Sequence, residues 1–189
     1  MSVVQPARPA KLVVSILTAR RELFGRVLGL LERNYGRADL ISAWLAFEYT
    51  RYYEAEMGSP LFRRMASFSR LIEQTDLADI KLLTNEVEGR FAESSLRRVN
   101  IDPGYLLYER FVLATGKNFS HRIYLGKGIY ADLTLTYAKG AFQPLPWTYP
   151  DYAAEDIQAF LRRARDKYTV DNRRRSVENE NAPATGNIS

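Results

Sequence analysis

Cysteine is absent from the chain, and histidine occurs only once, as His121. Structural disulfides, thiolate zinc sites and cysteine nucleophiles are therefore excluded, and the lack of cysteine fits a reducing compartment. Two further motifs are missing. No Gly-x-Ser-x-Gly sequence marks a serine nucleophile, and no glycine-rich loop ends in Gly-Lys-Ser or Gly-Lys-Thr. No reaction can therefore be assigned from a known catalytic motif.

Long hydrophobic runs are also absent. No apolar segment approaches the roughly 20 residues that a helix needs to cross a bilayer, and the first eleven residues have no apolar stretch of signal-peptide length. We therefore expect a cytoplasmic protein with no membrane partner. With 46% apolar and 26% charged residues in a chain of 189, the composition is typical of one globular domain that buries a core without disulfides.

The formal net charge is +5. Residues 171–189 contribute three arginines and three carboxylates, which cancel, so the excess lies on the rest of the chain. An excess of this size favours anionic partners only weakly, and it is more often simply a charge that keeps a protein soluble.

Hydrophobic periodicity divides the first half of the chain into six elements. Alternation with a period of two predicts strands, and apolar residues at steps of three or four predict helices. In chain order these are a strand over 11–17, a helix over 20–35, a strand over 39–49, a strand over 61–72, a helix over 75–91 and a strand over 96–102. This order is the split βαβ pattern of a ferredoxin-like sandwich, an antiparallel sheet with helices on one face.

The sequence Asp102-Pro103-Gly104 predicts a turn after these elements, because proline cannot extend a strand ladder and glycine tolerates turns. Residues 105–115 fit either a short helix or another strand, and their length and the closing Gly116 favour the helix. The Gly126-Lys127-Gly128 turn joins two alternating segments, 121–125 and 129–137, in a predicted β-hairpin.

The C-terminal part contains an irregular, proline-rich segment over 142–150, and then a third helix that begins at Asp151. Acidic residues in the first turn of this helix and basic residues in its last turn suit the helix dipole. The polar composition of 171–189 predicts a disordered tail, and residues 1–10 predict a flexible arm. We therefore expect one α+β domain over 11–170, a ferredoxin-like sandwich extended by a C-terminal hairpin and a third helix.

Four basic residues lie within eleven positions, among the glycines of the predicted hairpin. They are Lys117, His121, Arg122 and Lys127. Glycine turns let backbone N–H groups approach an anion, while lysine and arginine supply charge and a bidentate fork, so the pattern suits a phosphate. The alternative is a glycine hairpin with ordinary basic residues at its rim.

Asp102 is the strongest candidate for a catalytic base, because it lies at the predicted end of a strand before a sharp turn. His121 is the second candidate, as a general acid or base. We expect the two to converge. Carboxylates that meet could instead hold Mg²⁺, with Asp102, Glu48 or Asp132 as ligands. Asp102 could equally bond only its own turn backbone.

Aromatic residues are frequent near these polar segments, with 12 tyrosines in the chain. Tyr52, Tyr105 and Trp147 could cover an apolar or base moiety, since such rings offer a flat face and a polar tip. The leading hypothesis is therefore a site for a small phosphorylated ligand such as a nucleotide. Exposed tyrosines on a ferredoxin-like sheet also suit single-stranded RNA, although the RNP1 pattern is absent. A non-catalytic interaction protein is a further alternative.

Several long phrases are shared with one protein family. They are Asp-Pro-Gly-Tyr-Leu (102–106), Val-Leu-Ala-Thr-Gly-Lys (112–117), His-Arg-Ile-Tyr-Leu (121–125), Gly-Ile-Tyr-Ala-Asp-Leu-Thr-Leu (128–135) and Trp-Thr-Tyr-Pro-Asp-Tyr (147–152). Through them the chain resembles a family of uncharacterised bacterial proteins, domain of unknown function 4416, over nearly all of residues 11–170. The resemblance implies a shared fold and a bacterial source, and it brings no established activity.

Overall fold

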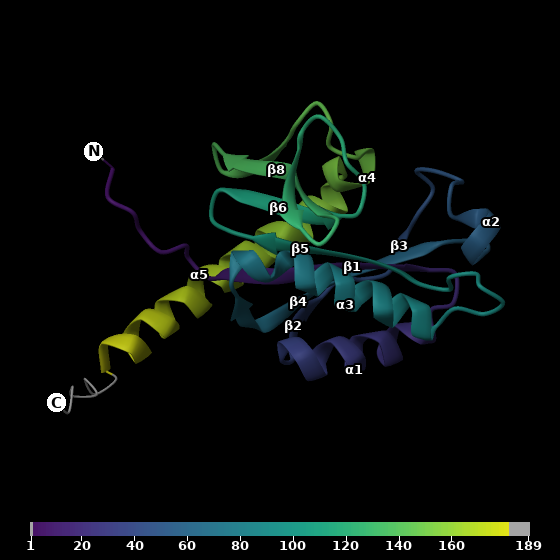
Figure 1. The fold of residues 1–189 in the computed structure, drawn as a ribbon, viewed down its shortest axis with the longest axis horizontal. Coiled ribbons are helices and arrows are strands. Elements are labelled where there is room, and N and C mark those ends of the chain that lie inside the picture. Colours follow the sequence, from purple (N-terminus) through teal and green to yellow (C-terminus); the bar gives the residue numbers. More distant parts are fainter. Residues whose placement is uncertain (1, 182–189) are drawn as a thin grey trace.

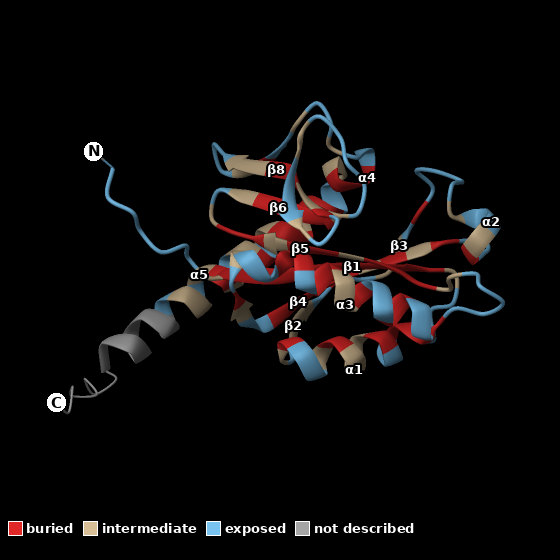
Figure 2. Ribbon diagram, in the orientation of Figure 1, coloured by how far each residue is buried: buried red, intermediate tan, exposed pale blue. Residues whose placement is uncertain are grey.

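The strand β1 (Ala10–Thr18) lies at the centre of the sheet, and all of its residues are buried. It pairs antiparallel with β4 (Phe62–Ile72) on one side and with β5 (Asn100–Leu106) on the other. Its two valines and its isoleucine suit a strand that is covered on both faces. The predicted strand over 11–17 is thus confirmed, and Figure 2 shows buried residues concentrated on β1, β4 and β5.

The computed structural model describes residues 2–181, with side chains described through Arg173. Besides β1, β4 and β5, the strands are β2 (Ala38–Ile41), β3 (Leu45–Ala46), β6 (Arg110–Thr115), β7 (Arg122–Gly126), β8 (Ile129–Ala138) and β9 (Ala141–Pro144). The helices are α1 (Leu23–Tyr35), the short α2 (Glu54–Met57), α3 (Leu77–Arg90), α4 (Pro150–Ala153) and α5 (Glu155–Asn181), and a 3₁₀ turn, Gln74–Asp76, precedes α3.

The nine strands form one antiparallel sheet in the order β2-β4-β1-β5-β6-β8-β7, with β3 paired to β4 and β9 paired to β8. In Figure 1, β6 and β8 lie above the layer of β1, β4 and β5, and α1 lies below it. The α+β class and the antiparallel sheet are confirmed. The ferredoxin-like topology is not confirmed, because the sheet continues through five more strands than that sandwich contains.

Helices cover both faces of the central strands. Neighbouring side chains on a strand point to opposite faces. The guanidinium of Arg64 lies 4.7 Å from the ring centre of Phe24 in α1, whereas Nη1 of Arg63 lies 2.5 Å from Oδ2 of Asp151 in α4. The α4–α5 segment therefore lies on the face opposite α1.

The strand predicted over 39–49 is wrong. Two short strands, β2 and β3, take its place, and both pair with β4. Between them, Ser42 accepts a hydrogen bond from the amide of Met65 through its hydroxyl. The ring of Trp44 packs edge-on against Phe24 of α1. These contacts break the regular ladder, which the alternation of apolar residues alone does not reveal.

The turn predicted at Asp102-Pro103-Gly104 is also wrong, since all three residues lie within β5. The amide of Ile101 donates away from β1, to Glu88 of α3. Pro103, two residues further on, has its ring nitrogen on the same outer side, where no ladder donor is required. Gly104 is needed for close approach: a Cβ there would lie 2.6 Å from the carbonyl oxygen of Val112 in β6.

The helix favoured for 105–115 is likewise wrong. Tyr105 and Leu106 complete β5, and after a tight turn the chain returns as β6, which pairs with β5 and β8. Residues 111–114 are apolar and buried. Such a short apolar run fits a strand enclosed between two others as well as it fits a helix. The hairpin of β7 and β8 is confirmed, with Lys127 and both flanking glycines at positive φ.

The helix α5 continues to Asn181, through the first eleven residues of the predicted tail. Residues 182–189 of that predicted tail lie outside the described residues. Near the point where the tail was expected to begin, the carboxylate of Asp171 lies 2.6 Å from Nζ of the fully buried Lys11. Among residues 2–181, no helix is long and apolar enough to cross a membrane.

Candidate functional site

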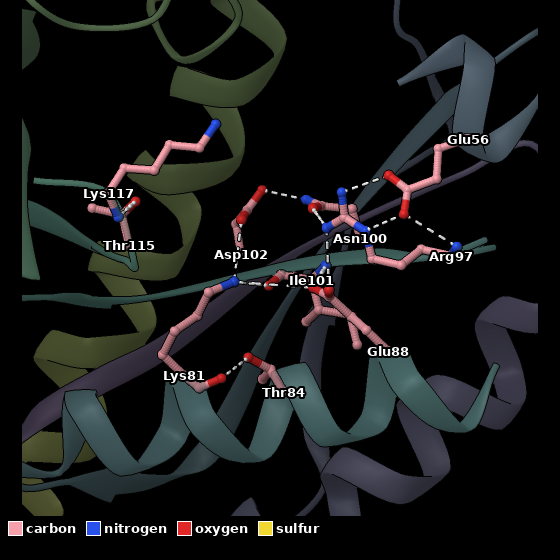
Figure 3. A network of polar contacts seen from close by, with 10 residues as sticks. All are labelled: Glu56, Lys81, Thr84, Glu88, Arg97, Asn100, Ile101, Asp102, Thr115 and Lys117. Carbon is pink, nitrogen blue, oxygen red and sulfur yellow. Dashed lines mark hydrogen bonds and ion pairs between the residues drawn. The ribbon is translucent and has the colours of Figure 1, made fainter. Parts of the chain in front are cut away.

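The site begins at an open edge of the central sheet. Strand β5 pairs with β6 only over Gly104–Leu106, so its outer edge has no strand partner at Ile101. Two side chains of α3 replace that partner: the amide of Ile101 donates to Glu88 at 2.6 Å, and Lys81 donates to the Ile101 carbonyl at 2.7 Å. Figure 3 shows both interactions. The separation of β5 from β6 leaves space above this edge.

A pocket of about 670 Å³ occupies this space. Its volume is within the range of about 300–1,000 Å³ that is typical of small-molecule sites. Five bases, four acids and a group of aromatic rings line it. The charged residues are Arg63, Lys81, Arg97, Lys117, Arg122, Glu88, Asp102, Asp132 and Asp151, and the rings are those of Phe47, Tyr49, Tyr52, Tyr53, Tyr149 and Tyr152.

Asp102 is part of the pocket lining. Asn100 donates a hydrogen bond to its carboxylate at 2.7 Å, and Lys81 Nζ lies 3.5 Å from its other oxygen. The side chain is 31% exposed, so a ligand can reach it. Burial raises the pKa of the Tyr53 hydroxyl to about 12, and the charge of Asp102 adds to that rise. The carboxylate is therefore held in place by two donors and remains accessible.

Glu88 is a buried carboxylic acid in the same wall. Its oxygens accept from the Ile101 amide and, at 3.3 Å, from Arg97, which also forms a two-pronged pair with Glu56. Burial raises the pKa of Glu88, and this effect outweighs the nearby charge of Lys81. A pocket acid whose pKa is raised by burial is a candidate for acid–base chemistry.

The Glu88 carboxyl allows a prediction about stability. Glu88→Ala leaves the buried amide of Ile101 without an acceptor and should lower the free energy of unfolding by about 1–3 kcal/mol. Glu88→Gln keeps an acceptor and removes the buried charge, so it should be the milder change. The pKa of Glu88 is higher in the folded protein than in the unfolded chain. Wild type should therefore lose stability relative to Glu88→Gln as the pH rises from the unfolded-state pKa to the folded-state pKa. Urea unfolding of both proteins between about pH 4 and 8 measures this, and a constant difference would contradict it.

Arg63 and Tyr152 form the most buried part of the pocket. Both side chains are almost inaccessible to solvent, and the guanidinium carbon of Arg63 lies 5.1 Å from the Tyr152 ring centre. Burial alone lowers the pKa of Arg63, but Tyr152, Asp151 and Asp102 offset this and keep it raised. Nη1 of Arg63 pairs with the Asp151 carboxylate at 2.5 Å, whereas its Nε atom has no hydrogen-bond partner among the described residues. A buried donor without a partner is unusual, since such groups are nearly always paired.

The mouth of the pocket is formed by the exposed residues Tyr52 and Lys117. Lys117 follows β6, and its ammonium lies 5.0 Å from the ring centre of Tyr52. Within the described part of the chain, this ammonium forms no hydrogen bond or ion pair. Arg122, in contrast, is engaged by the Asp132 carboxylate at 2.8 Å and by the Tyr149 hydroxyl at 3.0 Å. Lys117 is therefore the cation that is free to meet a ligand.

His121 lies behind the pocket wall. Its Nε2 atom is 3.3 Å from Oδ2 of Asp132, and its ring stacks on Trp147 with centres 4.8 Å apart. Asp102 and His121 were expected to converge, but only Asp102 lines the pocket. The structure brings His121 to Asp132 and Arg122 instead.

The remaining candidates are divided between the pocket and other places. Tyr52, Lys117 and Arg122 line the pocket. Lys127 pairs with Asp79 at the surface. Tyr105 packs against two parts of the hydrophobic core. Trp147 donates to the Leu133 carbonyl, and Glu48 is exposed and outside the pocket lining.

The carboxylates do not fit a magnesium ion. Asp132 is already bound by Arg122 and faces His121, while Asp102 faces Lys81 and accepts from Asn100. Mg²⁺ requires free carboxylate oxygens and room for its waters. Among residues 2–181, no group of three or more His, Asp or Glu side chains could hold a metal.

Four important pocket residues were not predicted from the sequence. They are Tyr53, Arg63, Lys81 and Asn100. Lys81 follows Ile80 in the helix and is buried, so a charged residue beside the apolar stripe was the available signal. Arg63 gave no such signal, since its burial depends on α4, which is distant in sequence.

The comparisons with known proteins identify a family and nothing further. The family model described as Domain of unknown function (DUF4416) matches residues 8–168. A search of curated proteins and a search of solved structures each found no match. Since the family model spans most of the chain, the protein belongs to the family of domain of unknown function 4416.

Proposed function

We propose that the protein binds a small phosphorylated ligand, such as a nucleotide, in the pocket between β5 and β6. The observation that supports this most is the free ammonium of Lys117 beside the exposed ring of Tyr52 at the pocket mouth. An unpaired cation suits a phosphate, and a tyrosine face suits an aromatic ring. The other basic side chains of the lining already have carboxylate partners.

Catalysis is a further part of the proposal, with Asp102 as the base. The carboxylate is reachable from the pocket and is fixed by Asn100 and Lys81. Lys81 lies 3.5 Å from Asp102, and burial raises the pKa of Glu88, the second acid of this wall. Two acids with different environments can divide the roles of base and acid.

Single-stranded RNA is the second candidate. Strand β7 carries consecutive exposed apolar side chains, and Phe119 just before it is 64% exposed. Exposed aromatic rings can stack bases. A concave pocket nevertheless favours a small ligand over a strand laid on a flat sheet face.

Isothermal titration with the four ribonucleoside 5′-monophosphates tests the proposal. At least one should bind, and Lys117→Ala should weaken it about tenfold or more, since a hydrogen bond to a charged group contributes about 1.5–3 kcal/mol. Lys127→Ala is the matched control, because Lys127 lies outside the pocket and pairs with Asp79. Equal affinities for wild type and Lys117→Ala would contradict the proposed phosphate position, and tight binding of oligoribonucleotides with no monophosphate binding would favour RNA.

A further inference from the structure

Helix α1 and the adjoining strand β4 present a group of arginines without carboxylate partners. Between positions 20 and 37 the chain has five arginines and two glutamates, and Glu32 is engaged by the amide of Ala38. Among residues 2–173, whose side chains the structure describes, five arginines of this region form no ion pair. These α1-face arginines are Arg21, Arg26, Arg33, Arg37 and Arg64.

The α1-face arginines lie on the solvent side of the helix. All the apolar residues that α1 buries pack toward the sheet. Arg26 and Arg33 are about two turns apart and so share one side of α1, Arg37 follows just after its end, and all three are exposed. Arg64 joins them from β4, with its guanidinium 4.7 Å from the Phe24 ring centre. In Figure 1, α1 lies away from β6, β8 and α4, and none of the five arginines lines the nucleotide pocket.

Two of these guanidiniums are held by aromatic rings instead of acids. That of Arg21 lies 3.6 Å from the Phe62 ring centre and 5.5 Å from that of Trp44. That of Arg64 lies 5.2 Å from the Trp44 ring centre, and its Nε donates to the Ser42 carbonyl. Packing on a ring fixes a guanidinium and leaves its charge uncompensated. Because Arg21 is exposed, the guanidinium face turned away from Phe62 is open to solvent.

The chemistry of this face favours a nucleic acid strand over other anionic partners. A helix that binds a lipid surface buries its apolar side in the membrane, but the apolar side of α1 is already packed on the sheet. A phosphodiester chain repeats the oxygens that the arginine fork matches. Unpaired bases also stack on guanidinium planes, which the side chains of an acidic protein segment do not. The bases of a duplex are stacked on one another, so a single strand is the better fit.

We propose that the α1-face arginines bind single-stranded nucleic acid, with phosphates at Arg26, Arg33 and Arg37 and a base on the open face of Arg21. This surface is separate from the nucleotide pocket and does not depend on the proposed function. It is also distinct from β7, whose exposed side chains suggested RNA above.

The test is fluorescence anisotropy with a labelled oligouridylate of about 20 nucleotides, which has no self-complementary sequence, between about 50 and 200 mM salt. The triple variant Arg26→Gln, Arg33→Gln and Arg37→Gln removes three uncompensated charges. It should weaken binding about tenfold or more at the lowest salt concentration. It should also reduce the slope of log K against log salt by about 2, since each phosphate contact of a single strand contributes about 0.7.

The matched control is a second triple variant with the same change in net charge. It replaces by glutamine three cations that already have carboxylate partners, and these are Arg110, Lys127 and Arg162. The control should leave the salt slope nearly unchanged. Thermal melting of both triple variants checks folding; if the arginine triple melts early, Arg33→Gln alone should still reduce the slope by about 0.7.

The stacking contact is tested by Arg21→Lys, which keeps the charge and removes the guanidinium plane. It should weaken the oligouridylate about threefold. Arg33→Lys is the control, because Arg33 is exposed and packs on no ring among the described residues. It should bind as wild type does. Equal effects of the two lysine substitutions would contradict the stacked base.

Three outcomes would overturn the proposal. One is that wild type does not bind oligouridylate at about 50 mM salt, and another is that both triple variants lose equal affinity. The third is that polyglutamate, vesicles of anionic phospholipid or a duplex of the same length binds as tightly as the single strand. The proposed function is tested separately, because the arginine triple variant should bind monophosphates as wild type does.

Discussion

Lys11→Met should lower the free energy of unfolding by about 3–5 kcal/mol, the range for removing one partner from a buried ion pair. The side chain of Lys11 is fully buried, and its Nζ atom lies 2.7 Å from Asp39, 2.6 Å from Asp171 and 3.0 Å from the Phe68 carbonyl. The substitution keeps an apolar chain of similar length and leaves the two carboxylates without their central cation. Chemical denaturation at neutral pH measures the loss.

Lys167→Met is the matched control. Lys167 approaches the same Asp39 carboxylate at 3.6 Å, but its side chain is 39% exposed. A pair that is accessible to solvent contributes about 0.2–1 kcal/mol. If Lys11→Met lowers the free energy of unfolding no more than Lys167→Met does, the charge of Lys11 does not hold α5 to the sheet.

Phe91→Ala should lower the free energy of unfolding by about 3–5 kcal/mol, the range for removing a buried ring. Phe91 lies just after α3 and is buried in the main core together with Ile80 and Val87. The guanidinium of Arg26 from α1 lies 5.2 Å from its ring centre, so the ring joins the two helices. Denaturant titration gives the value directly.

Phe119→Ala controls for the loss of a phenyl ring as such. Phe119 is mostly exposed, and surface substitutions usually change stability by no more than about 0.5 kcal/mol. A Phe91→Ala effect below about 1 kcal/mol would mean that this stripe of α3 is not packed in the core.

The parts of the fold that were predicted from sequence are those governed by local periodicity. The apolar stripe of α1 ends at Gly36, whose φ of +79° suits glycine. The Gly126-Lys127-Gly128 turn likewise defines the hairpin of β7 and β8 by itself. In both cases, neighbouring residues contain enough information to determine the element.

The parts that were not predicted depend on partners distant in sequence. Pro103 and Gly104 have turn-forming chemistry, yet they lie in β5 because its outer edge is open and because β6 approaches closely. Asp171 follows the last apolar stripe by three residues and seemed to begin a polar tail. Its partner Lys11 is 160 positions away, and no local pattern indicates such a pair.

The candidate site follows the same division. Asp102 was selected for the wrong reason, as a turn residue, and it lies in the pocket because β5 and β6 separate there. His121 was paired with Asp102 by proximity to polar segments, whereas the strand register places Arg122 opposite Asp132 and brings His121 to the same carboxylate. Strand register determines which polar residues meet, and the sequence does not specify it.

Ligand binding between β5 and β6 can be tested most directly by an assigned ¹H–¹⁵N NMR titration with each of the four ribonucleoside 5′-monophosphates. The expected result is that at least one shifts the backbone amides of 100–102, 115–117 and 151–152, which border the pocket from three separate segments. Shifts confined to the exposed residues 123–125 of β7, or no shifts with any of the four, would contradict a nucleotide site in this pocket.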